Sequence, residues 1–332
     1  MMKTFIIAEA GANHNRDFNQ ALKLIDVAKE SGADAVKFQT YSSETLYSKN
    51  TPDFAGYKDI NKLIKNIELP REWQKDLKQY CDEQNIEFMS TPFDEKAIDE
   101  LVNLGVKRLK IAGFESTDPR FVDMVCSAKL PIIASLGIGS NSDPWMTNSV
   151  DSILDTAQKH NITDVTFLHC NNAYPTPPEN TYLDTIKIMS KDLRYKVGFS
   201  DHTMSPYTPS LAVAVGATVI EKHFTLDRNL PGPDHPFALE PKELKTMVEQ
   251  IRYTEKCMGY KKGFSPSEEN FKTAMRSIVA KTPIKKGEIF TKENLTTKRP
   301  FLEGNVAASE WEHTIGKVSN QDYNIDDFIF GK

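Results

Sequence analysis

Two histidines stand at the ends of two successive apolar segments in the second half of the chain. His202 closes "KVGFSDH" (196–202), and His223 lies near the end of "VIEKHFT" (219–225). If these segments are neighbouring parallel strands, their C-terminal ends lie side by side and the two imidazoles can share one metal ion. Two nitrogen ligands leave positions open for water and a substrate oxygen, which suits a Lewis acid. A pair of general acids or neutral hydrogen-bonding histidines explains the spacing equally well.

Two lysines interrupt other apolar segments, Lys37 in "AVKFQ" and Lys110 in "RLKIA". A buried ammonium is costly unless an anion pairs with it, so a purely structural role is a poor explanation. Together with Ser and Thr hydroxyls at the ends of other segments, these lysines predict a pocket for phosphate or carboxylate. The sequence has no glycine-rich phosphate loop, so side chains must hold the anion. A Schiff-base aldolase would also use one of these lysines.

These residues stand at or near the ends of eight short runs rich in Val, Ile and Phe, as expected of strands buried on both faces. The runs are 5–11, 34–40, 87–91, 108–113, 131–137, 165–170, 196–202 and 219–225. Amphipathic helical patterns between and after them include 19–32, 94–105, 205–217 and 240–259. Eight strand-plus-helix units in about 250 residues favour a (β/α)8 barrel, an α/β fold with its active site at the C-terminal ends of the strands. An open doubly wound sheet is the alternative.

Three regions depart from this repeat. Residues 41–70 form a long insert after the second strand, which favours a functional loop or lid. After a catalytic barrel at 1–259, residues 260–276 are predicted to be a linker. The tail, 277–332, is predicted to be a small, mostly β domain. A domain of that size has only marginal stability alone, so we expect it to pack against the barrel or against a second subunit.

Composition narrows the class of protein. The chain has 332 residues, 39% of them hydrophobic, and a net charge of −5, which gives no reason to expect nucleic acid as a partner. Its four cysteines are far apart and contain no CxxC pair. The start is interpreted as a first strand and not as a signal peptide, and no run is long enough to span a membrane. We therefore expect a reduced, cytoplasmic protein.

Literal motifs along the chain resemble those of the sialic acid synthases. They are "IIAEAGANHN", "GADAVKFQTY", "STPFD", "LKIAGFE", "HCNNAYPTPPE", "VGFSDHT", "VIEKHFTLDRNLPGPDH" and "IKKGEIFTKENLTTKRP", in order from about residue 4 to residue 330. That family condenses phosphoenolpyruvate (PEP) with an amino-sugar aldehyde to form nine-carbon sialic-type acids. The tail is similar to the antifreeze-like (SAF) domain that follows the barrel in these enzymes.

The resemblance implies a transferase that forms a carbon–carbon bond, and it implies roles for individual residues. His202 and His223 would bind a divalent metal, first of all Mn²⁺, with Mg²⁺ or Co²⁺ as the other options. The implied PEP contacts are Lys37, Gln39, Thr91, Lys110, Ser135, Asn172 and Ser200. The implied sugar contacts are Glu9, Glu115, Tyr174, Asp234 and Arg299. Glu115 or Glu9 would be the acid/base beside Lys110. Arg299 would reach the active site of the other subunit in a domain-swapped homodimer.

Two positions depart from the neuraminate-forming pattern. Gly113 replaces a serine expected to contact PEP, and Leu136 replaces a residue that carries a hydroxyl. The sugar stays open between N-acetylmannosamine, a 2,4-diacetamido-trideoxyhexose and a 6-phosphorylated sugar. A PEP-dependent synthase for phosphorylated sugars, a Schiff-base lysine aldolase and a non-enzymatic scaffold are the rival interpretations.

Overall fold

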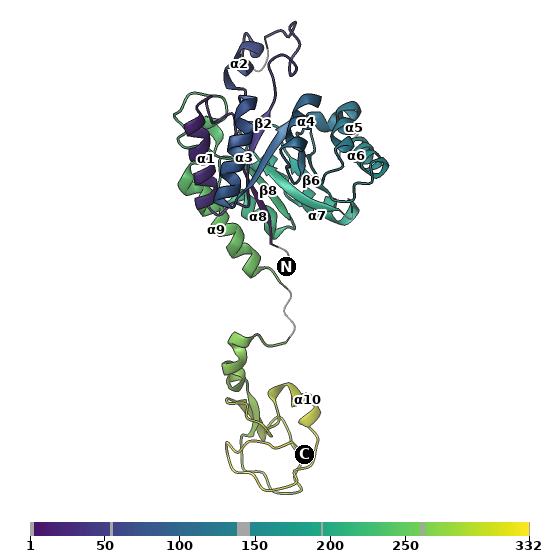
Figure 1. Ribbon diagram of the computed structural model, residues 1–332. Coiled ribbons are helices and arrows are strands. Elements are labelled where there is room, and N and C mark those ends of the chain that lie inside the picture. Colours follow the sequence, from purple (N-terminus) through teal and green to yellow (C-terminus); the bar gives the residue numbers. More distant parts are fainter. Residues whose placement is uncertain (1–2, 54–55, 138–146, 194, 260–262, 332) are drawn as a thin grey trace. The chain divides into compact units, whose positions relative to one another are not determined.

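The computed structural model describes the chain in five stretches, which are residues 3–53, 56–137, 147–193, 195–259 and 263–331 (Figure 1). The chain divides into two compact units, Met1–Met258 and Gly259–Lys332. Residues 260–262, at the start of the predicted linker, lie outside the described residues. The rest of that predicted linker contains a 3₁₀ helix, Pro266–Ala274.

Eight parallel strands form the centre of the first unit. They are β1 (Phe5–Gly11), β2 (Ala35–Thr40), β3 (Glu87–Pro92), β4 (Leu109–Ile111), β5 (Ile132–Ser135), β6 (Val165–Cys170), β7 (Lys196–Asp201) and β8 (Val219–His223). Their order is β3-β2-β1-β8-β7-β6-β5-β4, and the two outer members, β3 and β4, also lie against each other. The sheet therefore closes on itself, which confirms the predicted barrel. Each strand falls within two residues of a predicted run at either end.

Nine helices of the first unit are described. Most of them surround the barrel, whereas α2 lies in the insert beyond the strand ends (Figure 1). They are α1 (Phe18–Glu30), α2 (Ile60–Ile67), α3 (Gln74–Gln84), α4 (Glu95–Asn103), α5 (Pro119–Ser127), α6 (Thr147–Lys159), α7 (Asp184–Leu193), α8 (Thr208–Ala214) and α9 (Pro241–Cys257). The sequence dictates their ends locally. Asp17 caps α1 by accepting from two backbone N–H groups, Asp94 caps α4, and Pro241 occupies the first turn of α9.

The interior of the barrel is built in layers, and this layering positions the site. An apolar layer inside the strands consists of Ile7, Ala35, Met89, Ile133, Leu168 and Val219. Side chains two positions apart on a strand point to the same face. The next inward layer is therefore Glu9, Lys37, Thr91, Ser135, Cys170 and Glu221. The strands thus carry an apolar floor and, directly above it, a polar layer at their C-terminal ends.

The insert at 41–70 folds on an apolar cluster of its own. Tyr41, Ile60 and Ile64 are buried together there, and Phe93, which directly follows β3, packs against them. The insert contains α2, which the sequence analysis did not predict. The described part of the insert is therefore folded around its own apolar cluster, and its role as a functional loop or lid stays a prediction.

The second unit is small and has a separate core. Its strands β9 (Ser277–Ala280) and β10 (Leu295–Lys298) pair antiparallel, and one short helix, α10 (Trp311–Thr314), is present. The core consists of Ile278, Ala280, Ile284, Phe290, Leu295, Tyr323 and Ile329. Short bridges connect further extended segments in this unit. The mostly β character predicted for the tail is confirmed.

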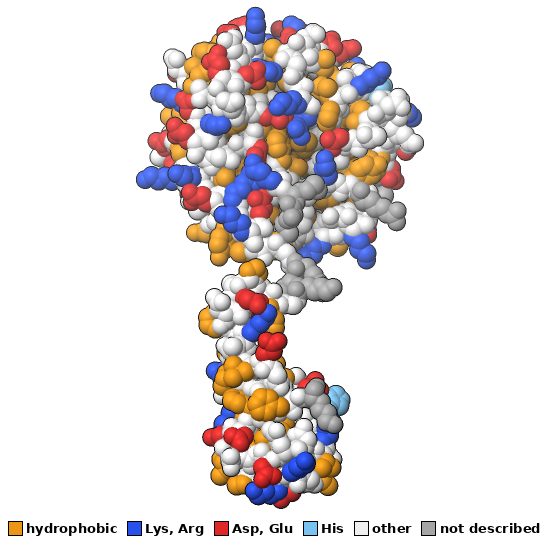
Figure 2. Space-filling model, turned by 60° about the horizontal axis from the view of Figure 1, so that its bottom comes forward, with side chains coloured by type: hydrophobic (Ala, Val, Ile, Leu, Met, Phe, Trp, Pro, Cys, Tyr) orange, Lys and Arg blue, Asp and Glu red, His pale blue; other side chains and the backbone are white. Residues whose placement is uncertain are grey.

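The surface fits the small net charge of the chain, −5 over 332 residues. On the face of the first unit that Figure 2 shows, basic and acidic side chains are interspersed. In the part of the chain that the structure describes, every helix is too short or too polar to cross a membrane.

Candidate active site

Four buried charged side chains meet at the C-terminal ends of the strands, and we call Glu9, Lys37, Lys110 and Glu221 the charged cluster. Lys37 Nζ lies 2.6 Å from Glu9 Oε2 and 3.7 Å from Glu221 Oε2. Lys110 Nζ lies 3.6 Å from Glu221 Oε1. All four residues are buried, with at most 5% of each exposed. The two predicted lysines therefore share one site, with carboxylates between them.

Hydroxyl groups on neighbouring strands hold the lysines of the charged cluster. Lys37 Nζ donates to Thr91 Oγ1 at 2.9 Å, and Lys110 Nζ donates to Ser135 Oγ at 2.8 Å. Both hydroxyls belong to the polar layer that the strand alternation predicts. They are suitably placed to contact an anion bound between the ammonium groups.

The two carboxylates of the charged cluster have polar neighbours of their own. Gln39 Nε2 donates to Glu9 Oε1 at 3.0 Å. Ser200 Oγ donates to Glu221 Oε1 at 3.1 Å. The family resemblance implied both Gln39 and Ser200 as site residues, and the structure places both beside the charged cluster.

Burial and mutual charge set the ionisation of the charged cluster. Burial by itself would lower the pKa of Lys37, but Glu221 and Glu9 outweigh it and the pKa is raised. Burial lowers the pKa of Lys110, and Glu221 offsets this only in part. Burial would raise the pKa of Glu221, but Lys110 and Lys37 hold it below its ordinary value. Burial raises the pKa of Glu9 to about 7. Near pH 7 Glu9 is thus close to half-protonated, and the two carboxylates offset part of the positive charge of the lysines.

The two histidines at the ends of β7 and β8, His202 and His223, lie next to each other above the charged cluster. The ring centroids of His202 and His223 are 5.4 Å apart. The Nδ1–H of His202 donates to the Asn171 carbonyl at 2.7 Å, because a carbonyl can only accept. The Nε2 lone pair of His202 is therefore available. His223 Nδ1 is buried and has no hydrogen-bond partner among the described residues.

These observations fit a divalent cation at the histidine pair. Burial lowers the pKa of His202 to about 4 and the pKa of His223 well below its ordinary range, so both rings are neutral and can act as ligands. Imidazole nitrogens suit first-row divalent ions. Among the described residues no group of three or more His, Cys, Asp or Glu side chains has a metal-binding arrangement. A cation here would take two protein nitrogens and keep open positions.

Two aromatic side chains and one carboxylate lie beside the histidine pair. The Tyr174 ring lies 4.2 Å from the His202 ring, and the Phe237 ring lies 5.1 Å from the His223 ring. Asp234 Oδ2 accepts the Ala12 N–H at 3.1 Å and lies 3.9 Å from His223 Nδ1. Tyr174 is 48% exposed, so this side of the site opens towards solvent. Two of the five predicted sugar residues, Tyr174 and Asp234, therefore border the histidine pair.

Gly113 and Glu115 occupy the turn after β4. A Cβ atom on residue 113 would lie 2.7 Å from Asn172 Oδ1, so the Asn172 amide fills the space that a side chain would need. Burial raises the pKa of Glu115, whose Oε2 has no hydrogen-bond partner among the described residues. Leu136 belongs to the apolar layer outside the barrel, so its missing hydroxyl does not open a gap in the polar layer.

Sequence reasoning missed one member of the charged cluster, and it assigned one site residue, Arg299, to the tail and not to the barrel. Glu221 was read as part of the apolar run "VIEKHFT", although its spacing of two from His223 already puts both on the inward face. Arg299 belongs to the second unit, where it is exposed directly after β10.

The fold and the site define a class: an α/β barrel with a buried cluster of charged side chains and a histidine pair at its C-terminal mouth, followed by a small β domain. The chain belongs to the NeuB family, whose model matches residues 24–263, and the SAF domain model matches residues 275–331. The resemblance to the sialic acid synthases is thus confirmed at the level of the family.

Individual relatives cover nearly the whole chain. It is 38% identical to the N,N'-diacetyllegionaminic acid synthase of Campylobacter jejuni over 99% of both chains. It is 39% identical to the enzyme of the same name from Legionella pneumophila, over 95% of this chain and 90% of that protein. The crystal structure of the N-acetylneuraminic acid synthetase of Leptospira borgpetersenii with citrate superposes with a TM-score of 0.73, at 34% identity, covering 81% of this chain and 90% of that one.

Proposed function

We propose that this chain is a nonulosonic (sialic-type) acid synthase that condenses PEP with the aldehyde of an N-acetylated amino sugar and releases phosphate. The observation that carries the proposal is the charged cluster directly below the histidine pair at the mouth of the barrel. The names of the relatives support a synthase of this kind. The cluster suits a small, multiply charged acid, and the space above it suits a carbonyl compound.

PEP would bind with its anionic groups between Lys37 and Lys110. Thr91 and Ser135, each already bonded to one of these lysines, would donate to the same oxygens. Gln39, Asn172 and Ser200 would complete the pocket. Holding PEP in one orientation above the apolar floor directs its C3 carbon away from the floor and towards the histidine pair.

The sugar would occupy the more open side of the site. Tyr174 and Asp234 border the histidine pair there and would contact its hydroxyl and amide groups. A divalent cation held by His202 and His223, Mn²⁺ in the first place and otherwise Mg²⁺ or Co²⁺, would supply Lewis-acid polarisation of the aldehyde. Arg299 of a second copy would reach this side in a domain-swapped homodimer.

The reaction then follows from the chemistry of an enol phosphate. C3 of PEP attacks the aldehyde carbon, a C–C bond forms, and positive charge develops at C2. Water adds to C2, and the tetrahedral intermediate loses phosphate by cleavage of the C–O bond. Lys37 and Lys110 offset the charge of the phosphate throughout. Glu9 or Glu115 exchanges the proton with the aldehyde oxygen or the water, because burial raises both pKa values towards the range of a working acid/base.

Among the possible sugars, a 2,4-diacetamido-trideoxyhexose is the first choice. Two relatives that cover nearly the whole chain are both named N,N'-diacetyllegionaminic acid synthases. N-acetylmannosamine and a 6-phosphorylated sugar are the competing substrates.

The test is one assay with each sugar in turn. Purified protein, PEP and Mn²⁺ are incubated with each candidate in H₂¹⁸O, and phosphate and product masses are measured. The proposal expects a nine-carbon acid and phosphate free of ¹⁸O, since C–O cleavage leaves the original bridging oxygen on phosphorus. Phosphate that carries ¹⁸O, or no product with any sugar, would refute it. Turnover of the 6-phosphate alone would favour the rival synthase for phosphorylated sugars.

Lysine variants separate the proposed chemistry from a Schiff-base aldolase. Lys110→Met should reduce kcat/KM for PEP by at least about 100-fold, since it removes a charged partner. The matched control is Lys196→Met, at the opposite end of β7, where the lysine pairs with Asp164 at 2.9 Å; it should retain activity. Trapping of a substrate–lysine adduct by borohydride, with activity insensitive to EDTA, would support the aldolase instead.

A further inference from the structure

A second charged pair lies on the outer face of the strands that carry the histidines. Asp201 of β7 and Lys222 of β8 are register partners, and Lys222 Nζ lies 2.7 Å from Asp201 Oδ2. Since neighbouring residues on a strand point to opposite faces, this pair points away from the site that holds Glu221 and His223. Both side chains are fully buried, at 1% and 0% exposure. None of the chemistry described above uses them.

The ammonium group of Lys222 binds the residues on both sides of His202, the Asp201 carboxylate on one side and the Thr203 backbone on the other. Besides Asp201, it donates to the Thr203 carbonyl, and Thr203 Oγ1 lies 3.3 Å away. Asp201 Oδ1 accepts the Thr203 N–H at 2.9 Å, and Oδ2 accepts the Thr203 hydroxyl at 3.1 Å. The turn Asp201–His202–Thr203 therefore folds around the buried ammonium group of Lys222. We call these three residues, Asp201, Thr203 and Lys222, the clamp.

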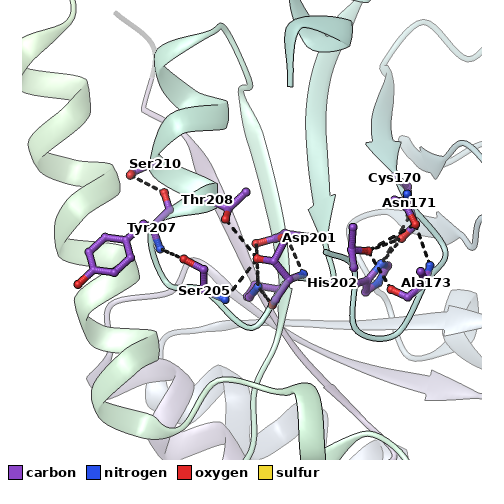
Figure 3. Close-up of polar contacts among 12 residues, drawn as sticks. Cys170, Asn171, Ala173, Asp201, His202, Ser205, Tyr207, Thr208 and Ser210 are labelled. Atoms are coloured by element: carbon purple, nitrogen blue, oxygen red, sulfur yellow. Dashed lines mark hydrogen bonds and ion pairs between the residues drawn. The ribbon is translucent and has the colours of Figure 1, made fainter. Parts of the chain in front are cut away.

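Contacts from β6 and the loop after it fix the other side of His202. The Asn171 carbonyl accepts the ring Nδ1–H, and the Thr176 N–H donates to the His202 carbonyl at 2.9 Å. Figure 3 shows the arrangement: Asp201 points towards Thr208, while the ring of His202 points to the opposite side, towards Asn171. His202 is thus held by its ring on one side and by its flanking backbone on the other.

Stability alone does not explain the clamp. The layer between the strands and the helices is otherwise built largely from apolar side chains. Removing two charges from water costs several kcal/mol per ion, and well-packed apolar residues of similar volume are often as stable or more so. A fully buried pair at this place is better explained by the geometry that it imposes. Lys222 also directly precedes His223, so one side chain ties the strand of one histidine to the turn of the other.

We propose that Asp201 and Lys222 are positioning residues of the histidine pair. They hold the turn at 201–203 so that Nε2 of His202 faces His223, and the two nitrogens are set for one divalent cation before it arrives. The inference rests on the metal site of the proposed function. It assigns to the outer face of β7 and β8 a role in metal affinity that is separate from the stability of the barrel.

The test is the Mn²⁺ affinity of the purified full-length protein, measured by calorimetric titration. A single variant would leave an unpaired buried charge and unfold part of the barrel. The main variant is therefore Asp201→Asn with Lys222→Met, which removes both charges at nearly constant volume. Mutation of residues that orient metal ligands without touching the metal weakens metal affinity roughly 10- to 100-fold, and we expect a loss in that range here. Wild-type affinity in the folded double variant would overturn the proposal.

A matched control and a second variant keep the outcome decisive. Asp34→Asn with Arg252→Met removes another charged pair of the barrel, 2.7 Å apart and partly buried, and should leave the affinity within about twofold. Thr203→Val keeps both charges and the side-chain volume but removes the hydroxyl that donates to Asp201 Oδ2 and accepts from Lys222, and it should weaken Mn²⁺ binding by at least about threefold. Unchanged affinity in Thr203→Val would also refute the clamp. If wild-type protein does not bind Mn²⁺ at all, the metal site itself is wrong and the clamp proposal is refuted with it.

Discussion

Replacing Gly113 with alanine should weaken PEP binding through the side chain of Asn172. The added Cβ would lie 2.7 Å from Asn172 Oδ1, and 3.3 Å from both Asn172 Nδ2 and Gly137 Cα. Ordinary contact begins at 3.4 Å, so the amide oxygen must withdraw by 3.4 − 2.7 = 0.7 Å. Asn172 can give way, because within the described part of the chain its side chain makes only a weak hydrogen bond, which Oδ1 accepts from Cys170 Sγ at 3.6 Å.

The size of the effect follows from that displacement. A hydrogen bond to a charged group contributes about 1.5–3 kcal/mol, so its loss raises KM for PEP roughly 10- to 100-fold. The protein should stay folded, with a loss of stability of at most about 2–3 kcal/mol. Gly113 has no left-handed backbone that alanine would strain. The entropic gain of about 0.4–1 kcal/mol from a Gly→Ala change offsets part of an overpacking cost of about 1–3 kcal/mol.

Steady-state phosphate release at varied PEP, with saturating sugar and Mn²⁺, measures KM, and thermal unfolding checks the fold. Gly259→Ala is the matched control, because a Cβ there meets nothing within 4 Å. In an Asn172→Ala background the Gly113→Ala change should add no further loss, since the two act through one contact. A wild-type KM in Gly113→Ala would show that the Asn172 amide does not contact PEP.

Two further predictions follow from ionisation and burial. Burial raises the pKa of Glu9 from 4.5 to about 7, so between these pH values the folded chain holds a proton that the unfolded chain releases. The resulting contribution to the free energy of unfolding is fully present below pH 4.5 and is lost as the pH rises through 7. The stability of wild type relative to Glu9→Gln, measured by urea unfolding, should therefore fall between pH 5 and pH 8, and a flat difference would contradict the buried carboxyl. Burial raises the pKa of Cys81 to about 12 and of Cys126 to about 11, whereas Cys257 is exposed. Iodoacetamide at pH 8 should label Cys257 first by mass spectrometry, and equal labelling of Cys81 in the folded protein would refute the described packing.

The strands and most of the site could be predicted because both depend on local rules. An apolar inward residue such as Ile7 is followed two positions later by a site residue such as Glu9, and the same holds for Ala35 and Lys37. The parallel barrel then brings all strand ends together without any further information. The alternation along eight such segments therefore identifies most residues of the polar layer from the sequence.

The unpredicted parts depend on pairing between distant segments. The partners of Lys222 are set by the register of β7 against β8, so nothing within "VIEKHFT" indicates that this lysine reaches Thr203. The helix expected at 205–217 is shorter, Thr208–Ala214, because the residues before it form a turn in which Ser205 Oγ accepts the Tyr207 N–H. Competition from such side-chain bonds is a property of turns that a helical periodicity does not reveal.

The layering also bears on where substrate choice resides. Under the proposed function, the strands supply the charged cluster and the histidine pair, so their inward positions are committed to PEP and the metal. The remaining sugar contacts of the barrel come from loops, as with Glu115, Tyr174 and Asp234. The insert at 41–70 also lies near these loops. Burial raises the pKa of its Tyr47, and the nearby Glu115 carboxylate raises that pKa further. Exchanging loop residues can therefore change the sugar without disturbing the strand-borne chemistry, whereas a strand substitution such as Lys110→Met should reduce turnover of every sugar alike.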